Sequence, residues 1–261
     1  MNGSRRRSTA SPFGAGRIVF WRGGSLWIGH AARETEYHAH HAIQITLALA
    51  GGMLRFRQPG QAWASYGAAI VAAHASHAFD ARDTLVALVF VEPESLEGRA
   101  LRERYLDGIA SLDGGLLAEQ ADRLAASYAR HDGDEALASC AQAVTTGLSS
   151  MHHSSPKPLD KRIARAIDLL RERLADAVQM SEIADAVHLS PERFRHLFLQ
   201  ETGIRFRPYV LWLRLEVALA RYEAGSSLTE ASHAGGFADS AHFSRTFKRM
   251  FGVTAIGVQR A

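Results

Sequence analysis

The stretch GGFADSAHFSRTFKRMFG, residues 235–252, decides the fold of the C-terminal part because its pattern occurs twice. The other copy is HLSPERFRHLFLQETG, residues 188–203. Each copy places a helix-capping residue, Asp239 or Ser190, before a short apolar helix pattern that ends at a glycine. The same length separates cap and glycine in both copies, so the chain is expected to build one helical unit twice.

Each copy is preceded by a shorter apolar helix pattern, and two short helices joined by a tight turn form a helix-turn-helix. In the first unit a helix over 180–187 leads into a turn at His188, and Pro191 opens the next helix, where its missing N–H is harmless. In the second unit the turn is one residue longer, and Gly236 supplies the permissive backbone that His188 must supply. A single long helix over 206–225 is expected to join the two units.

The second helix of each unit has an apolar side and an opposite side that faces away from the core. In the first unit the outward side carries Glu192, Arg195, His196 and Leu199. In the second it carries Ala241, Ser244, Arg245 and Lys248. Because polar side chains there can reach base edges, two such helices at a fixed separation are expected to enter successive major-groove segments about 10 bp apart. Lys248 is better interpreted as a phosphate contact.

The composition is that of a globular protein with packed domains, and it does not by itself identify a function. The chain has 261 residues, 47% hydrophobic and 22% charged, which favours two modest cores over one large one. Net charge is only +3, with the small excess in the C-terminal part. The single cysteine, Cys140, excludes an internal disulfide framework and fits a reducing compartment. No apolar run is long enough to span a bilayer, so we expect a cytoplasmic protein without a membrane partner.

Five segments are expected along the chain. Residues 1–16 form a basic, disordered tail, and residues 17–92 form a strand-rich domain with Gly-Gly and Pro-Gly turns. A helical segment over 93–150 follows, then a polar linker at 151–158 that contains two prolines. Residues 159–261 are helical throughout.

Within the segment 93–150, one helix pattern carries an apolar stripe made of Leu137, Cys140, Val144 and Leu148. Such a stripe either packs on its own domain or pairs with a second copy of the chain. A homodimer is therefore a possible assembly.

Residues 159–260 resemble the DNA-binding domain of the AraC/XylS family of bacterial transcription regulators, through SPERFRHLFLQETG, YVLWLRLEVA and GGFADSAHFSRTFKRMFG. The resemblance implies double-stranded DNA as partner, with RNA polymerase as a further one. It places base contacts on Glu192, Arg195 and His196 and on Ser240, Ala241, His242, Ser244 and Arg245. Four positions depart from the family pattern: His188, Gly235, Ala255 and Val258.

The N-terminal domain resembles the cupin-like effector domain that many members of that family carry. In EYHAHHAIQITLALAGG, residues 36–52, His38, His40 and Gln44 are similar to the first cupin metal motif, with Gln in place of Glu, and His77 stands near the second motif's histidine. The fold class implied is α+β multidomain, with a cupin-like β-barrel and flanking helices before the all-α domain with two helix-turn-helix units. The four residues line either an effector pocket or, less favoured, a divalent metal site.

Two functions follow from these patterns. The first is a sequence-specific DNA-binding regulator, activator or repressor, that responds to an unknown small molecule and needs no cofactor. The alternative is a metal-dependent cupin enzyme with a helical appendage. The duplicated outward faces favour the regulator, since an enzyme would not need them, and no catalytic triad order or phosphate loop favours an enzyme.

Overall fold

A computed structural model describes residues 15–151, 156–174, 178–255 and 259–260. The expected tail lies almost wholly outside these ranges, as do half of the expected linker and Val258. No helix within the described ranges has the length and apolar character that crossing a membrane requires.

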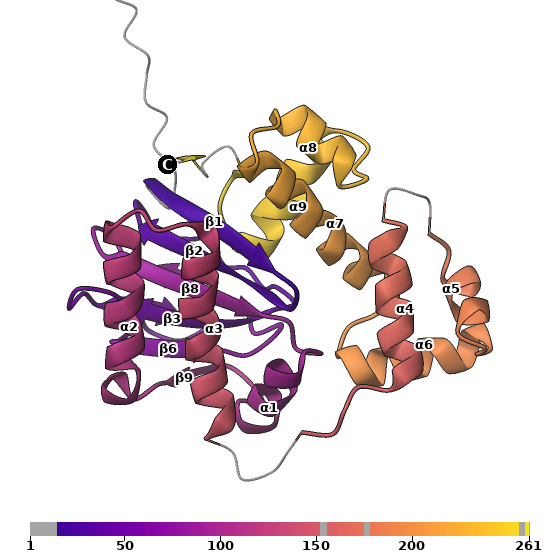
Figure 1. The fold of residues 1–261 in the computed structure, drawn as a ribbon, viewed down its shortest axis with the longest axis horizontal. Coiled ribbons are helices and arrows are strands. Elements are labelled where there is room, and N and C mark those ends of the chain that lie inside the picture. Colours follow the sequence, from indigo (N-terminus) through magenta and orange to yellow (C-terminus); the bar gives the residue numbers. More distant parts are fainter. Residues whose placement is uncertain (1–14, 152–155, 175–177, 256–258, 261) are drawn as a thin grey trace, which may run out of the picture.

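The N-terminal domain is built on two sheets (Figure 1). The larger has the order β10-β1-β2-β8-β3-β6-β9 and is antiparallel except where β10 pairs with β1. The smaller has the order β5-β4-β7. The strands are β1 (Ala15–Trp21), β2 (Gly24–His30), β3 (Ile43–Ala48), β4 (Leu54–Arg57), β5 (Ala64–Tyr66), β6 (Ala68–Val71), β7 (Ala78–Asp80), β8 (Leu85–Val91), β9 (Ile109–Ser111) and β10 (Gln259–Arg260).

A cupin-like β-barrel with flanking helices was expected; the strand-rich domain with flanking helices is present, but its barrel is not closed. The strands remain as two separate sheets. The physical reason is that side chains of the C-terminal domain share one core with the inner faces of both sheets, and the Phe251 ring lies 4.7 Å from that of Trp27 and 5.7 Å from that of Phe90. Closure of the sheet would expel this aromatic cluster.

Strand β8 shows how the larger sheet serves two cores. Val86, Leu88 and Phe90 point toward the smaller sheet and the C-terminal domain, whereas the alternate residues Ala87 and Val89 point toward the helices on the other face. Successive side chains of a strand point to opposite faces, so a strand buried on both sides is apolar throughout.

The helices of the segment 93–150 are α1 (Leu96–Arg104), α2 (Gly114–Ala129) and α3 (Asp134–Ser150). Helices α2 and α3 cover one face of the larger sheet, and strand β9 extends its edge by pairing with β6 (Figure 1). Leu137, Val144 and Leu148 of the expected stripe are buried in this core, and Cys140 is half-buried. The stripe therefore packs on its own domain.

The C-terminal domain contains six helices within the described residues: α4 (Lys161–Glu172), α5 (Met180–Ala186), α6 (Pro191–Thr202), α7 (Phe206–Glu223), α8 (Leu228–Ala234) and α9 (Ser240–Phe251). Helix α7 runs between the pair α5 and α6 and the pair α8 and α9 (Figure 1). Its fully buried residues Tyr209, Leu213 and Leu215 hold the domain together. The two helical pairs match the expectation. The expectation that residues 159–261 are helical throughout is wrong at β10, which leaves the helical domain to pair with β1 at the edge of the larger sheet.

Candidate nucleic-acid interface and histidine centre

The first helix-turn-helix consists of α5 and α6. His188 adopts a left-handed backbone, with φ of 57°, and Leu189 N–H donates to the carbonyl of Ala184 across the turn at 2.9 Å. Ser190 then caps α6 by accepting a hydrogen bond from Arg193 N–H at 3.3 Å. The local geometry agrees with the sequence expectation for both His188 and Ser190.

The outward face of α6 is exposed. Glu192, Arg195 and His196 lie in solvent, and Glu192 joins them: its Oε1 is 2.6 Å from Arg195 Nη2 and 2.7 Å from His196 Nε2. The hydrogen bonds from these two side chains lower the pKa of the Glu192 carboxyl. Leu199, 42% exposed, stands beside them. Glu192 thus holds the Arg195 guanidinium by an ion pair. A DNA base that binds Arg195 must therefore compete with the Glu192 carboxylate.

The second helix-turn-helix repeats this construction. Ser227 caps α8 in a reciprocal capping box with Glu230, and Gly236 takes the left-handed turn with φ of 71°. Asp239 caps α9 by accepting from His242 N–H at 2.6 Å. Gly235, one of the four positions that depart from the family pattern, has a steric reason to be glycine. A Cβ there would lie 2.5 Å from the carbonyl oxygen of Arg214 on α7.

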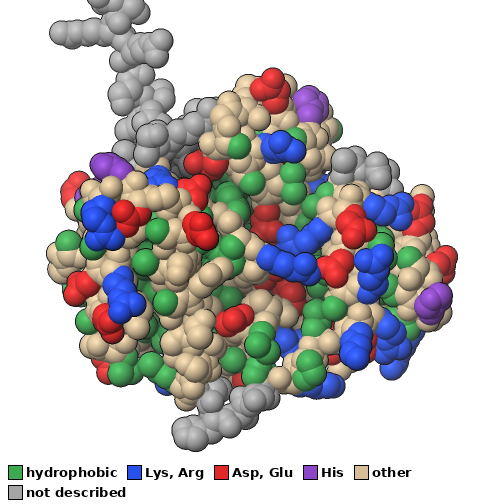
Figure 2. Space-filling model, viewed as in Figure 1, with side chains coloured by type: hydrophobic (Ala, Val, Ile, Leu, Met, Phe, Trp, Pro, Cys, Tyr) green, Lys and Arg blue, Asp and Glu red, His purple; other side chains and the backbone are tan. Residues whose placement is uncertain are grey.

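The outward face of α9 is only partly free. Ala241 and Arg245 are exposed, while Ser240, His242 and Ser244 are half-buried. Lys248 is exposed, and its Nζ pairs with Glu36 Oε1 of the N-terminal domain at 2.7 Å. Figure 2 shows Lys and Arg side chains clustered on the lobe of the C-terminal domain, with Asp and Glu among them.

The end of α9 enters the N-terminal domain. The Phe247 and Phe251 rings contact Trp27, at 6.1 and 4.7 Å between ring centres. Gly252, which follows α9 as its C-cap, accepts a hydrogen bond from Glu36 N–H at 3.0 Å through its carbonyl oxygen, and a Cβ at Gly252 would lie 2.4 Å from the Glu36 carbonyl oxygen. A glycine with φ of 68° is therefore required both to end α9 and to admit this contact.

Beneath this contact lie the histidines singled out in the sequence. His38 and His77 pair through two backbone hydrogen bonds, with their rings 4.2 Å apart, and the His40 ring lies 5.3 Å from that of His77. Candidate ligand atoms of the three side chains all lie within 4.8 Å of one another, and all three side chains are buried. Gln44 joins them, with Oε1 3.0 Å from His40 Nε2.

Burial keeps these imidazoles neutral. It lowers the pKa of His38 to about 3, with the neighbouring His40 acting in the same direction. Burial also lowers the pKa of His40 and, together with the two neighbours, that of His77. His38 and His40 also line a groove of about 610 Å³ against α7 and α9, whereas His77 and Gln44 are buried and do not line it.

A buried polar network between the domains was not foreseen from the sequence. Glu94 Oε2 lies 2.9 Å from His41 Nε2, and Tyr209 of α7 donates to Glu94 Oε1 at 2.6 Å. Burial alone would raise the pKa of Glu94, but the contacts with His41 and Tyr209 outweigh it and lower that pKa. Nearby, Arg171 of α4 pairs with Glu92. The sequence signal that could have indicated this network is the pair Glu92 and Glu94 in VFVEPE, directly after an apolar strand pattern.

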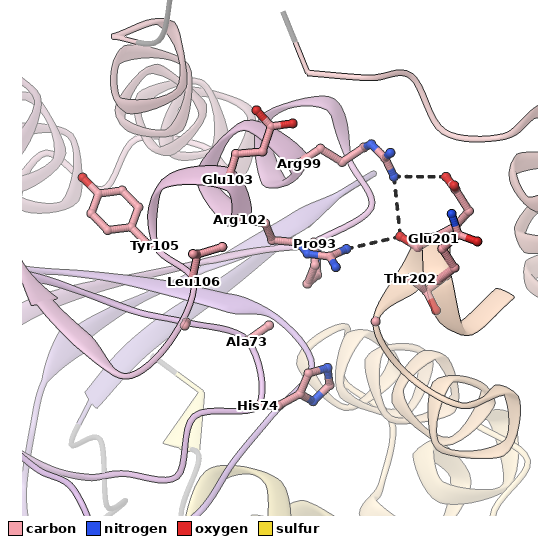
Figure 3. Close-up of a pocket in the computed structure, with 13 residues that line it drawn as sticks. Ala73, His74, Pro93, Arg99, Arg102, Glu103, Tyr105, Leu106, Glu201 and Thr202 are labelled. Carbon is pink, nitrogen blue, oxygen red and sulfur yellow. Dashed lines mark hydrogen bonds and ion pairs between the residues drawn. The ribbon is translucent and has the colours of Figure 1, made fainter. Parts of the chain in front are cut away.

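A second pocket lies where α1 meets the end of α6, with a volume of about 450 Å³ (Figure 3). Arg99 donates to the Glu201 carboxylate at 3.3 Å and Arg102 to the Glu201 backbone carbonyl at 3.2 Å. Burial and the charge of Arg99 lower the pKa of Arg102. These bonds fasten the C-terminal end of α6 to the N-terminal domain, where a positive charge is favoured by the helix dipole.

Comparison with known proteins supports the helical units. Residues 183–261 match the family described as a helix-turn-helix domain. The transcriptional activator RhaS of Escherichia fergusonii is 38% identical over 95 residues, which cover 36% of this chain and 34% of that protein. The arabinose operon regulatory protein of Escherichia coli is 31% identical over 113 residues, covering 41% and 37%. The chain thus spans about a third of the length of these relatives.

Two likenesses extend over most of the chain. The probable transcriptional regulator LumQ of Photobacterium leiognathi is 24% identical over 230 residues, covering 85% of this chain and 91% of that protein. The crystal structure of ToxT from Vibrio cholerae O395 superimposes with a TM-score of 0.58 at 10% identity, covering 92% and 95%. This second likeness concerns the two-domain fold. The C-terminal part of this chain, with its two helical units and their shared long helix, thus matches a helix-turn-helix domain and is similar to that part of the arabinose operon regulatory protein and of RhaS.

Proposed function

We propose that this protein is a sequence-specific DNA-binding transcription regulator. The observation that carries the proposal is the pair of capped helices α6 and α9, each with a solvent-facing arginine, Arg195 or Arg245, held apart by α7. An arginine on a recognition helix can bind guanine O6 and N7 together, which is the commonest specific base contact. The relatives RhaS and the arabinose operon protein are named as regulators, which supports the same role.

Selection of bound duplexes from a random library tests this function directly. We expect the full-length protein to enrich a site with two conserved segments about 10 bp apart, one for each recognition helix. The matched comparison is the double variant Arg195→Ala with Arg245→Ala, which should enrich no sequence. Enrichment of the same site by both proteins would show that α6 and α9 do not read bases.

The N-terminal domain is proposed to respond to a small molecule. The groove beside His38 and His40 lies between the two domains, so a ligand there would touch the interface that sets their arrangement. One solved structure of ToxT is described as bound to an unsaturated fatty acid, a property of that protein which makes an effector in this fold reasonable. Homodimerisation, contact with RNA polymerase and action in the bacterial cytoplasm belong to the same proposal.

The second candidate function is a metal-dependent enzyme, and the cluster of His38, His40 and His77 is the observation in its favour. Against it, Phe251 stacks on His40 at 5.9 Å, so the C-terminal domain covers part of the cluster, which an enzyme would not need. The regulator accounts for both the recognition helices and this cover. The enzyme accounts for neither.

A further inference from the structure

We propose that the pocket between α1 and the end of α6 binds one small organic anion, and that Arg102 holds the carboxylate or phosphate group of this anion. Anion binding is a claim about the pocket alone. Its consequence for DNA binding rests on the function proposed above.

The first observation is an unbalanced charge. Arg99 and Arg102 lie one turn apart on α1 and line the pocket together. The Glu201 carboxylate pairs with Arg99 at 3.3 Å, but within the described ranges no carboxylate forms an ion pair with Arg102. Glu94, whose charge also reaches Arg102, is already bound in the buried network between the domains. Because Arg102 is half-buried, a negative charge beside it is favoured.

The second observation is that one edge of the Arg102 guanidinium has no partner. Nη1 donates to the Glu201 backbone carbonyl at 3.2 Å, whereas Nε and Nη2 make no hydrogen bond within the part of the chain that the structure describes. Nε and Nη2 lie on the same edge of the planar group, and this edge matches the two oxygens of a carboxylate or phosphate. An anion can therefore bind Arg102 without displacing Glu201.

Neighbouring side chains leave this edge open. A Cβ at Gly203 would lie 3.3 Å from Arg102 Nη2, so a larger residue there would stand against the guanidinium. Glu103 also lines the pocket, but its carboxylate points away from Arg102 (Figure 3). The place beside Arg102 is thus free of protein carboxylates and of a side chain at position 203.

The walls indicate the rest of the ligand. Beside its charged groups, the pocket is lined by three small apolar residues and one exposed leucine: Ala72, Ala73, Pro93 and Leu106. Its volume of about 450 Å³ is typical of small-molecule sites. A cationic group together with an apolar wall suits a compact organic anion, either a short carboxylic acid or an organic phosphate.

The bound anion joins the two domains. Arg102 belongs to α1, whereas Gln200 and Gly203 line the pocket from the end of α6. A ligand between them stabilises the docked arrangement of the C-terminal domain, in which Glu36 pairs with Lys248. Because that ion pair keeps Lys248 from a DNA phosphate, the anion should weaken DNA binding.

Binding is tested on the full-length protein, without an affinity tag, at constant ionic strength. Inorganic phosphate, acetate and butyrate each replace chloride, while the Tm and the arginine side-chain N–H signals in NMR spectra are followed. We expect a saturable shift of one arginine signal and a higher Tm in the wild type, and neither in Arg102→Gln. The matched control is Arg104→Gln, an exposed arginine on α1 that does not line the pocket, which should behave as the wild type.

Arg102→Lys keeps the positive charge and guards against a folding defect in Arg102→Gln. Lysine offers no planar fork, so this variant should bind the anion roughly tenfold more weakly than the wild type. Equal binding by wild type and Arg102→Gln, equal binding by wild type and Arg102→Lys, or no binding of the three anions by the wild type would each overturn the proposal.

The three anions also distinguish the two sources of the charged group. Butyrate that binds at least about threefold more tightly than acetate would mark a carboxylic acid that uses the apolar wall. Phosphate that binds more tightly than both would mark an organic phosphate.

DNA binding is measured separately, on the selected duplex, with the tightest anion in place of chloride. General competition for phosphate contacts affects wild type and Arg102→Gln alike, so the prediction concerns their difference: a further loss of about fivefold in the wild type alone. Anion binding needs no DNA and DNA binding in chloride needs no other anion, so failure of the pocket and failure of the proposed function give different results. Equal losses in the two proteins would overturn the link from the pocket to DNA binding.

Discussion

The Tyr209 hydroxyl lies 2.6 Å from Glu94 Oε1, which joins the long helix α7 to the segment that follows strand β8. Both side chains are buried. The bond is thus part of the contact between the domain that is proposed to sense and the domain that is proposed to read DNA.

Removal of this hydroxyl should loosen the interface. Tyr209→Phe leaves the Glu94 carboxylate with one bond fewer in a buried site, so the free energy of unfolding should fall by about 1–3 kcal/mol. Urea unfolding measures it. The control is Tyr37→Phe, whose hydroxyl lies 3.4 Å from a carbonyl at the surface and whose loss should change little. Equal effects of the two variants would show that the Tyr209 bond does not stabilise the fold.

Arg195 and Arg245, on the outward faces of α6 and α9, should affect the sequence specificity of DNA binding. Arg195→Ala should weaken the selected duplex by about 1–3 kcal/mol and relax preference in one segment, and Arg245→Ala should do the same in the other. Fluorescence anisotropy on single-base variants of the duplex measures this. Arg123→Ala, an exposed arginine on α2 far from both faces, is the control. Unchanged base preference in both segments of the duplex would show that α6 and α9 do not contact the bases.

The pair formed by Lys248 and Glu36 should oppose DNA binding. Lys248→Ala should weaken all duplexes alike and reduce the salt dependence of binding by about one phosphate contact. Glu36→Gln releases Lys248 while keeping the backbone bonds of residue 36, so affinity should rise. Measurement over a series of salt concentrations separates the two effects, and weaker binding by Glu36→Gln would contradict the competition.

Two glycines offer a matched pair for the docking of α9. Gly203 and Gly252 cap the C-terminal ends of α6 and α9 in the left-handed region, with φ of 76° and 68°. Gly203→Ala should lower the free energy of unfolding by about 1 kcal/mol, mainly through backbone strain, because the new Cβ would meet only the flexible end of the Arg102 side chain, at 3.3 Å. Gly252→Ala adds a clash with the Glu36 carbonyl oxygen, so this variant should lose clearly more stability than Gly203→Ala. Similar thermal shifts in both variants would show that α9 docks less tightly than the contact distances indicate.

Acid should destabilise the protein partly through His74. Burial, with a smaller effect of His41, lowers the pKa of His74 to about 4, whereas the unfolded chain keeps about 6.5. The lowered value means that the stability contributed by neutral His74 is present above pH 6.5 and is lost as the pH falls through about 4. His74→Asn tolerates the left-handed backbone of this position, φ 65°, and should flatten the dependence of unfolding free energy on pH in that range. An unchanged slope would assign the acid sensitivity to other groups.

The helical units could be predicted from sequence because their signals are local. Ser190 and Asp239 cap where the pattern placed them, and His188 adopts the left-handed turn that the repeat required. Alternation along an expected strand suggested that His38 and His40 face the same side and that His77 could join them. The structure brings the three together, although they lie outside the named strands and His38 meets His77 through an isolated bridge.

The interface could not be predicted because its contacts join residues far apart in the chain. Nothing near Phe251 indicates that its ring packs on Trp27, since an aromatic residue at that position also suits the core of a helical unit. The failure of the barrel to close could not be predicted for the same reason, because a strand pattern specifies which face of a strand is apolar but not which residues cover that face. Glu94 and Tyr209 illustrate the same limit for polar groups.

The cover that Phe251 places on Trp27 also sets an order of events during synthesis. Strands β1 to β9 leave the ribosome first, but the aromatic residue that covers their apolar face belongs to α9, which is made after all of them. Domains generally fold as units from the N-terminal end. Here the sheets keep an exposed aromatic surface until α9 is made, so the nascent chain is expected to depend on chaperones over this interval.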